Sequence, residues 1–182
     1  SGNNFLLVEV AGASPQDLEE LVGKQGNFEA KIGNKTVFIG GEKDITHVFR
    51  DASQSAVYQA ESSGDGAYFS RFNFAITLSP EAAQRHADIT SKLSLASDDS
   101  RYLNESIFLF VDENEVSSLR IGASLKGNVA TEIQIQGSDL GETQEEACKV
   151  ARNSMNKLQT ILLTGSAHSP ILGTSFLVFN PP

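Results

Sequence analysis

Large apolar side chains recur at every second position in the centre of this 182-residue chain, and this spacing restricts the fold more than any other feature. They are Phe72, Phe74, Ile76 and Leu78. Because side chains of a strand point alternately to the two faces of a sheet, the spacing predicts a strand over 68–78 with one face buried. The same alternation in 28–32 and 131–136 predicts two further strands. The chain therefore has to build a sheet that packs a core against one face.

Helix start signals lie between the strand-like segments. Ser14 and Ser79 each precede a proline, which places a capping serine before a proline at the first helical position. These signals predict helices over about 14–23 and 80–93. Thr143 and Glu146 have the spacing of a capping box, and a helix is expected from there to about 164. Further strands are expected over 5–10, 36–39, 56–60, 107–111, 116–121 and 176–179.

The order of these elements predicts an α+β fold. Strand, helix, strand and strand at the start, with helix and strand at the end, give the βαββαβ order of a ferredoxin-like base. The residues between them would form an inserted α+β head lobe. The expected base comprises 1–42 and 143–182, and the expected head comprises 43–142. A single continuous α+β sheet is the alternative architecture.

The charge of the chain argues against one class of partner. With 14 basic and 23 acidic side chains, the formal net charge is −9. Such a chain repels phosphate backbones, and no cluster of Lys and Arg is interleaved with aromatic residues, so no nucleic-acid binding is expected. The longest apolar run, 107–111, has the length of a strand and falls short of the ~18 residues of a membrane-spanning helix.

The sequence contains no recognisable catalytic, metal-binding or cofactor-binding motif. His47, His86 and His168 lack the close spacing of a zinc site, and His86 is expected at the surface of its helix or at the boundary. No Gly-x-Ser-x-Gly elbow occurs, and the Gly-Lys pair at 23–24 lacks the other residues of a phosphate loop. Cys148 is the single cysteine, so no intrachain disulfide forms. We expect a non-enzymatic protein without a cofactor; an enzyme with a dispersed, motif-free site is the alternative.

Two N-x-[ST] sequences occur in predicted turns or loops. Asn34-Lys35-Thr36 and Asn104-Glu105-Ser106 both fit the acceptor pattern for N-glycosylation. Asn34 and Asn104 are therefore candidate glycosylation sites. Their presence is compatible with an extracytoplasmic location.

Five segments of the chain resemble, in the same order, the motifs of one known family. They are the strand and helix of 8–32, the helix start of 77–83, the hairpin of 110–118, the glycine and helix start of 137–147 and the helix end of 158–166. Together they resemble the first large extracytoplasmic domain of SecD, whose opening strand reads VEVPG where this chain has VEVAG. The segments GKQGNFEAKI and LQTILLTGS are most similar to the archaeal branch. The family's proline after the hairpin is missing, and its Gly-Ala-Leu-Pro motif is replaced at 165–170.

The resemblance implies a function that composition does not. SecD forms with SecF an accessory membrane complex of the SecY-type translocon channel, which uses the proton gradient to assist late translocation and release of unfolded preproteins. This chain would be the domain on the extracytoplasmic side of the cell membrane, joined to transmembrane helices outside the 182 residues. The resemblance further implies a base near the membrane and a head that moves as a unit. The alternative function is a soluble ferredoxin-like ligand-binding or regulatory domain.

Phenylalanines of the expected head are the candidate contacts for unfolded preprotein, through a strand edge or a shallow apolar groove. They are Phe69, Phe72, Phe74, Phe108 and Phe110. Alternation with polar neighbours is equally typical of core side chains in a half-buried sheet.

Glycines can absorb changes in φ and ψ, so a hinge is expected at four of them. These are Gly40, Gly41, Gly137 and Gly141.

Overall fold

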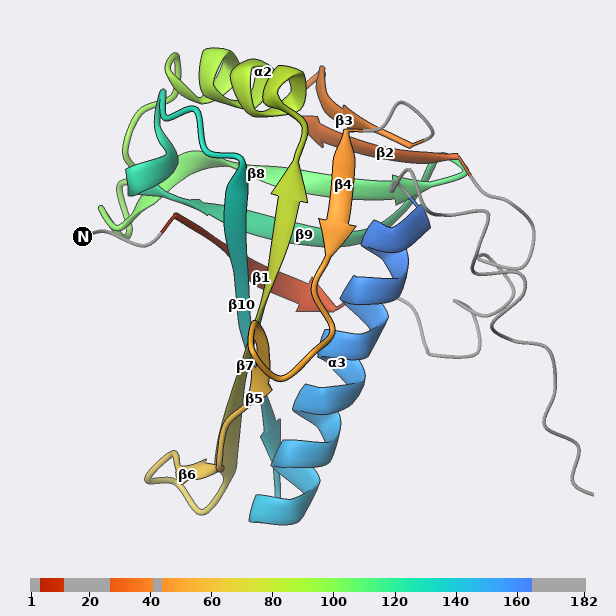
Figure 1. Ribbon diagram of the computed structural model, residues 1–182. Coiled ribbons are helices and arrows are strands. Elements are labelled where there is room, and N and C mark those ends of the chain that lie inside the picture. The colour runs from red at the N-terminus through yellow and green to blue at the C-terminus, as the bar shows by residue number, and fades with distance from the viewer. Residues whose placement is uncertain (1–3, 12–26, 41–43, 165–182) are drawn as a thin grey trace, which may run out of the picture.

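A computed structural model describes residues 4–11, 27–40 and 44–164 (Figure 1). Within these residues one ten-stranded sheet is accompanied by two α-helices and one short 3-10 helix. The strands are β1 (Phe5–Ala11), β2 (Phe28–Ile32), β3 (Lys35–Ile39), β4 (Ile45–Val48), β5 (Ser55–Val57), β6 (Glu61–Ser62), β7 (Tyr68–Leu78), β8 (Tyr102–Val111), β9 (Asn114–Gly122) and β10 (Glu132–Gly141). The helices are α2 (Pro80–Thr90), α3 (Gln144–Thr164) and the 3-10 helix η1 (Ala123–Leu125). The helix expected over 14–23, the strand expected over 176–179 and Gly41 lie outside the described residues.

The sheet is mixed, and its strands follow the order β3-β2-β8-β9-β1-β10-β7-β4. β1 lies in the middle, antiparallel to β9 and parallel to β10, with residues 5–7 opposite residues 134–136. β5 and β6 pair with β7 beyond β4. In Figure 1, β2, β8, β9 and β1 run horizontally across the picture, whereas β10, β7 and β4 run vertically. The sheet therefore changes direction between β1 and β10.

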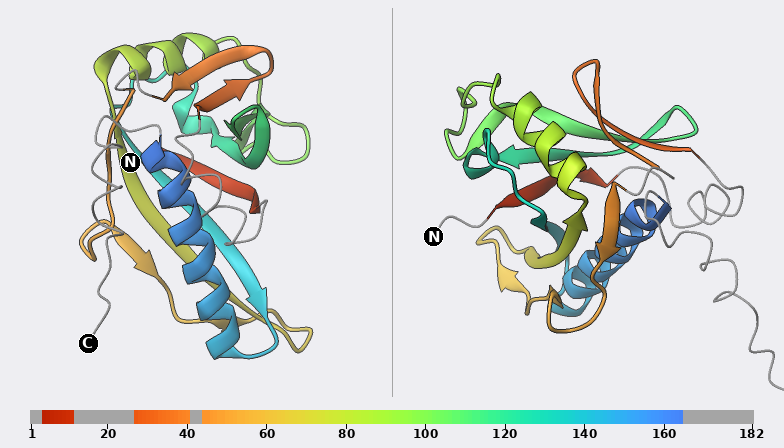
Figure 2. Two further views of the ribbon diagram at one scale, coloured as in Figure 1. Left: turned by 90° about the vertical axis from the view of Figure 1, so that its right-hand side faces the viewer. Right: turned by 45° about the horizontal axis from the view of Figure 1, so that its top comes forward.

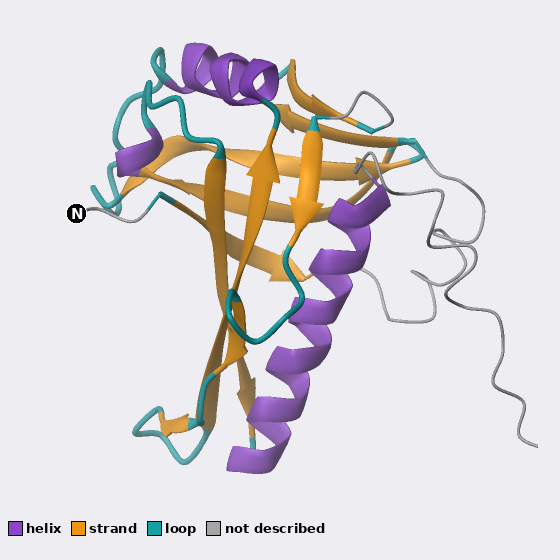
Figure 3. Cartoon of the chain, viewed as in Figure 1, coloured by secondary structure: helices purple, strands orange, loops and turns teal. Residues whose placement is uncertain are grey.

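The expected α+β fold with a ferredoxin-like base is wrong. In a βαββαβ unit the strands of the base form a sheet of their own, whereas here the β8–β9 hairpin lies between β1 and β2. The described part of the chain is mainly β, as the predominance of strands in Figure 3 shows. The sheet is continuous across the predicted boundary between base and head. The division into a base of 1–42 with 143–182 and an inserted head of 43–142 stays a prediction.

The elements themselves form largely where local signals place them. The alternating segment forms β7 with the predicted bounds. The side chain of Ser79 caps α2 by accepting a hydrogen bond from the Ala82 N–H at 3.1 Å. The Thr143 hydroxyl accepts from the Glu146 N–H at 3.1 Å, which confirms the predicted cap of α3. β8 begins five residues earlier than expected, and its early part forms a bridge between Leu103 and Leu95.

Both helices pack against the sheet and complete the core. α3 lies along β10 and β7, and α2 lies at the end of the sheet beside β3 (Figure 2). Apolar residues of the sheet and both helices join in one buried cluster. Among the described residues, no helix combines the length and the apolar composition that a membrane crossing requires.

Candidate functional site

One face of the sheet at β2, β8 and β9 carries partly exposed aromatic and charged side chains. Ile107, Leu109 and Val111 of β8 are at most 1% exposed and belong to the core. Because neighbours in a strand face opposite sides, Phe108 and Phe110 lie on the other side, where both are partly exposed. We call this side the outer face, and it comprises Glu29, Lys31, Phe108, Phe110 and Arg120. The register places Lys31 opposite Phe108 and Glu29 opposite Phe110.

A lysine and a glutamate border the ring of Phe110. The Lys31 Nζ lies 5.4 Å from the centre of this ring and 3.0 Å from the Glu29 Oε2. The Thr36 hydroxyl also donates a hydrogen bond to the Glu29 carboxylate. Hydrogen bonds from Thr36 and then Lys31 lower the pKa of Glu29 below its ordinary value. The carboxylate is therefore ionised at neutral pH and holds Lys31 beside the aromatic ring.

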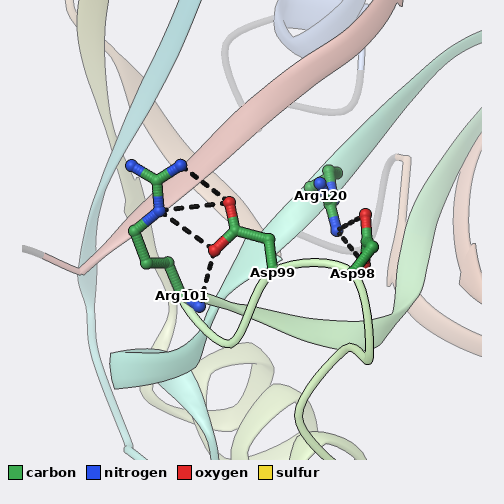
Figure 4. Close-up of polar contacts among 4 residues, drawn as sticks. All are labelled: Asp98, Asp99, Arg101 and Arg120. Atoms are coloured by element: carbon green, nitrogen blue, oxygen red, sulfur yellow. Dashed lines mark hydrogen bonds and ion pairs between the residues drawn. The ribbon is translucent and has the colours of Figure 1, made fainter.

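Two ion pairs lie near the other end of the outer face (Figure 4). Arg120 donates to both carboxylate oxygens of Asp98 at 3.0 Å, and its guanidinium lies 4.4 Å from the centre of the Tyr102 ring. Arg101 pairs with Asp99 at 2.7 Å, and hydrogen bonds from Arg101 lower the pKa of Asp99 to about 2. Exposed ion pairs of this kind contribute little stability. The bond to Asp98 helps to hold the Arg120 guanidinium over Tyr102.

The structure divides the five candidate phenylalanines between the two sides of the sheet. Phe72 and Phe74 are 2% and 0% exposed in the core, so they contact no external chain while the domain is folded. Phe69 is partly exposed at the far end of β7, opposite Leu140, which is 65% exposed. β10, β1 and β9 separate Phe69 from Phe108 and Phe110. The five rings therefore do not line one groove.

Side chains occupy two backbone groups of the edge strand β3 and one backbone group just after β4. On β3, the Ile39 N–H donates to Asp44 Oδ2 and the Val37 carbonyl accepts from Arg85, each at 2.8 Å. Arg85 also pairs with the buried Asp44 at 2.8 Å. Beyond β4, Gln159 of α3 donates to the Phe49 carbonyl at 3.0 Å. Each of these groups would have to lose its partner before an added strand could pair there, whereas a contact through the outer face needs no such exchange.

His86 is buried, which contradicts its expected place at the surface or boundary of its helix. It is 1% exposed, and its ring stacks on Phe38 with centroids 6.0 Å apart. Its Nε2 has no hydrogen-bond partner, and burial lowers its pKa from 6.5 to about 4. The spacing to Ala82 and Ala83, four and three residues earlier, puts His86 on the buried stripe and could have revealed this position. Within the described residues no group of three metal-ligating side chains forms a site.

Comparison with known proteins supports the resemblance seen in the sequence. No family model matches the chain. The protein-export membrane protein SecD of Methanothermobacter thermautotrophicus is 25% identical over 167 residues, which cover 91% of this chain and 34% of that protein. The SecD of Methanopyrus kandleri is 27% identical over 164 residues, which cover 87% of this chain and 35% of that protein. The chain is related to SecD. This SecD-related domain spans about a third of the length of these curated relatives.

Three of the candidate hinge glycines in this SecD-related domain make close contacts. A Cβ on Gly137 would lie 2.4 Å from the Phe72 ring, and a Cβ on Gly141 would lie 2.4 Å from the Ala147 nitrogen. The Gly40 N–H donates to the Phe28 carbonyl at 2.8 Å. At Gly137 and Gly141 glycine is therefore required for space. A hinge at these residues stays a prediction.

Both candidate glycosylation sites of the SecD-related domain lie at its surface. Asn34 occupies the turn between β2 and β3, and its side chain is exposed. Asn104 is exposed in the early part of β8, where its Oδ1 accepts from the Ser94 N–H at 3.0 Å. The two asparagines therefore differ in how firmly their side chains are held.

Proposed function

We propose that this domain is the exposed part of a SecD-type subunit, located on the extracytoplasmic side of the cell membrane. It would assist the SecY-type channel, together with SecF, in the late export and release of unfolded preproteins. The observation that carries the proposal is the match to two archaeal SecD proteins along about nine-tenths of the chain. Both relatives are named for protein export, and this favours export over the ligand-binding alternative. The proposal assigns no catalytic step to the domain.

The outer face is the surface on which we place the contact with a preprotein. An unfolded chain exposes apolar side chains in no fixed order. A partner that offers aromatic rings on an open surface can therefore bind many different sequences. Phe108 and Phe110 supply such rings. Lys31 and Glu29 place charge beside the Phe110 ring, and Arg120 lies on the same face; this charge would favour release because charged groups keep water at the surface.

A contact through the outer face differs from strand addition in what it requires. Strand addition needs free N–H and C=O groups along an edge, and on β3 the Ile39 N–H and the Val37 carbonyl already have partners. A contact through the rings leaves those bonds intact. The domain could then hold and release a moving chain without breaking its own sheet.

The experiment that tests this function is an export assay with the full-length protein in its own membrane. F108A/F110A is expected to slow maturation of secreted precursors several-fold, because the two substitutions remove both aromatic rings from the outer face. F69A is the matched control, since it removes a partly exposed ring far from the outer face. Protein levels are measured in parallel to separate binding from folding. Unchanged export in F108A/F110A would reject the assigned surface, and unchanged export after deletion of the whole gene would reject the export function.

A further inference from the structure

The turn between β2 and β3 exposes Asn34 and Lys35 of the sequence Asn34-Lys35-Thr36, whereas Thr36 is partly exposed in β3 and its hydroxyl donates to the Glu29 carboxylate. Asn34 is exposed, and the preceding Gly33 has a φ of +58°, which turns the chain tightly back. A Cβ placed on Gly33 would meet no atom within 4 Å. The turn is therefore open around Gly33, and the Asn34 side chain beside it is exposed to solvent.

The second sequence of this kind, Asn104-Glu105-Ser106, is held in the structure. The Asn104 N–H donates to the Ser94 carbonyl at 2.8 Å, and its Oδ1 accepts from the Ser94 N–H at 3.0 Å. Ser106 lies opposite Arg120 in the β8–β9 ladder. A sugar chain on Asn104 would have to share the space of the segment that its side chain binds.

We propose that Asn34 is N-glycosylated and that Asn104 is not. The inference rests on the proposed function, because the transfer requires the turn to be on the extracytoplasmic side of the membrane. The donor is an oligosaccharide linked to a lipid phosphate. The Asn34 Nδ2 forms a bond to the anomeric carbon, the bond from this carbon to the phosphate oxygen breaks, the lipid phosphate leaves and one amide proton passes to a base of the transferase.

A glycan at this position would also protect the edge of the sheet. β3 is an edge strand, and exposed strand edges promote association with other chains. Asp44 and Arg85 occupy backbone groups of Ile39 and Val37 near the end of β3. Asn34 immediately precedes the start of β3, so its glycan would be attached at the end of this edge strand that lies away from those two side chains.

Peptide mass spectrometry on the full-length protein from membranes of the organism that encodes it tests the assignment. The wild-type peptide with Asn34 is expected to carry a glycan, and the peptide with Asn104 is expected to be unmodified. T36S retains the hydroxyl of the acceptor sequence and should keep the glycan, whereas T36A and N34Q should lose it. N104Q is the matched control and should leave the glycan at Asn34 unchanged. An unmodified wild-type Asn34, or a glycan on Asn104, would overturn the proposal.

A labelling experiment separates failure of this inference from failure of the proposed function. In the full-length variant N34C/C148S, a membrane-impermeant maleimide is applied to intact and to lysed cells. Labelling in intact cells together with an unmodified wild-type Asn34 would overturn only the glycosylation. Labelling confined to lysed cells would overturn both the glycosylation and the extracytoplasmic location.

Discussion

Replacement of Gly137 by alanine is expected to destabilise the domain through a clash with Phe72. The added Cβ would lie 2.4 Å from Cζ and 2.7 Å from Cε1 of a ring that is itself 2% exposed, so the clash would fall inside the core. Overpacking of this kind costs about 1–3 kcal/mol. Alanine recovers about 0.5–1 kcal/mol relative to glycine in a strand. The middle values of these two ranges give a net loss of about 1 kcal/mol for G137A.

Urea denaturation of wild type, G137A, F72L and the double variant measures this loss and its origin. Leucine lacks the ring atoms that the new methyl group would meet, so G137A should cost clearly less in the F72L background. S138A changes an exposed neighbour on the same strand and should leave the free energy of unfolding nearly unchanged. An unchanged or raised stability of G137A, or an equal loss in both backgrounds, would refute the clash. If Gly137 acted only as a hinge, G137A would alter the motion of the domain, and its effect on stability would not depend on Phe72.

Two further predictions concern the packing of α2. The neutral His86 has a pKa of about 4 in the folded state and about 6.5 when unfolded. The unfolded state therefore binds the proton first, and stability should fall by up to about 3 kcal/mol as pH decreases from 6.5 to 4. Urea denaturation at several pH values measures this loss; H86Q should reduce the slope, and an equal slope in both proteins would contradict the assignment. D44A should leave the Ile39 N–H unpaired and speed its hydrogen exchange, whereas R101A, which removes an exposed ion pair, should not. Equal exchange at Ile39 in wild type and D44A would contradict the role of Asp44.

Local signals in the sequence predict the elements because each depends on neighbours in the chain. Asn73 and Thr77 alternate with large apolar residues, so β7 and its buried face can be predicted. Ser79 and Thr143 mark helix starts because their hydroxyl groups accept from the first turn. The strand order depends on pairings between distant residues, such as Leu6 with Ile135, and alternation does not identify such partners. Local signals therefore do not indicate that β8 and β9 lie between β1 and β2 in one sheet.

The candidate site was predictable only in part. Residues 107–111 are all apolar, so the sequence does not indicate which side of β8 faces the core. The structure assigns Leu109 to the core and Phe108 with Phe110 to the outer face. Phe72 and Phe74 alternate with polar residues such as Asn73, and this pattern is typical of core side chains. The structure confirms that both rings are buried.

Site-specific photo-crosslinking tests most directly whether this domain contacts exported chains through its outer face. A photoreactive phenylalanine analogue replaces Phe110 in the full-length protein, and Gln84, exposed on α2, is replaced as the control. Membranes that contain a secretory precursor arrested during export are then irradiated. We predict a covalent adduct between the precursor and the protein labelled at position 110, with little or none from position 84. No adduct from position 110, or equal adducts from both positions, would contradict the account.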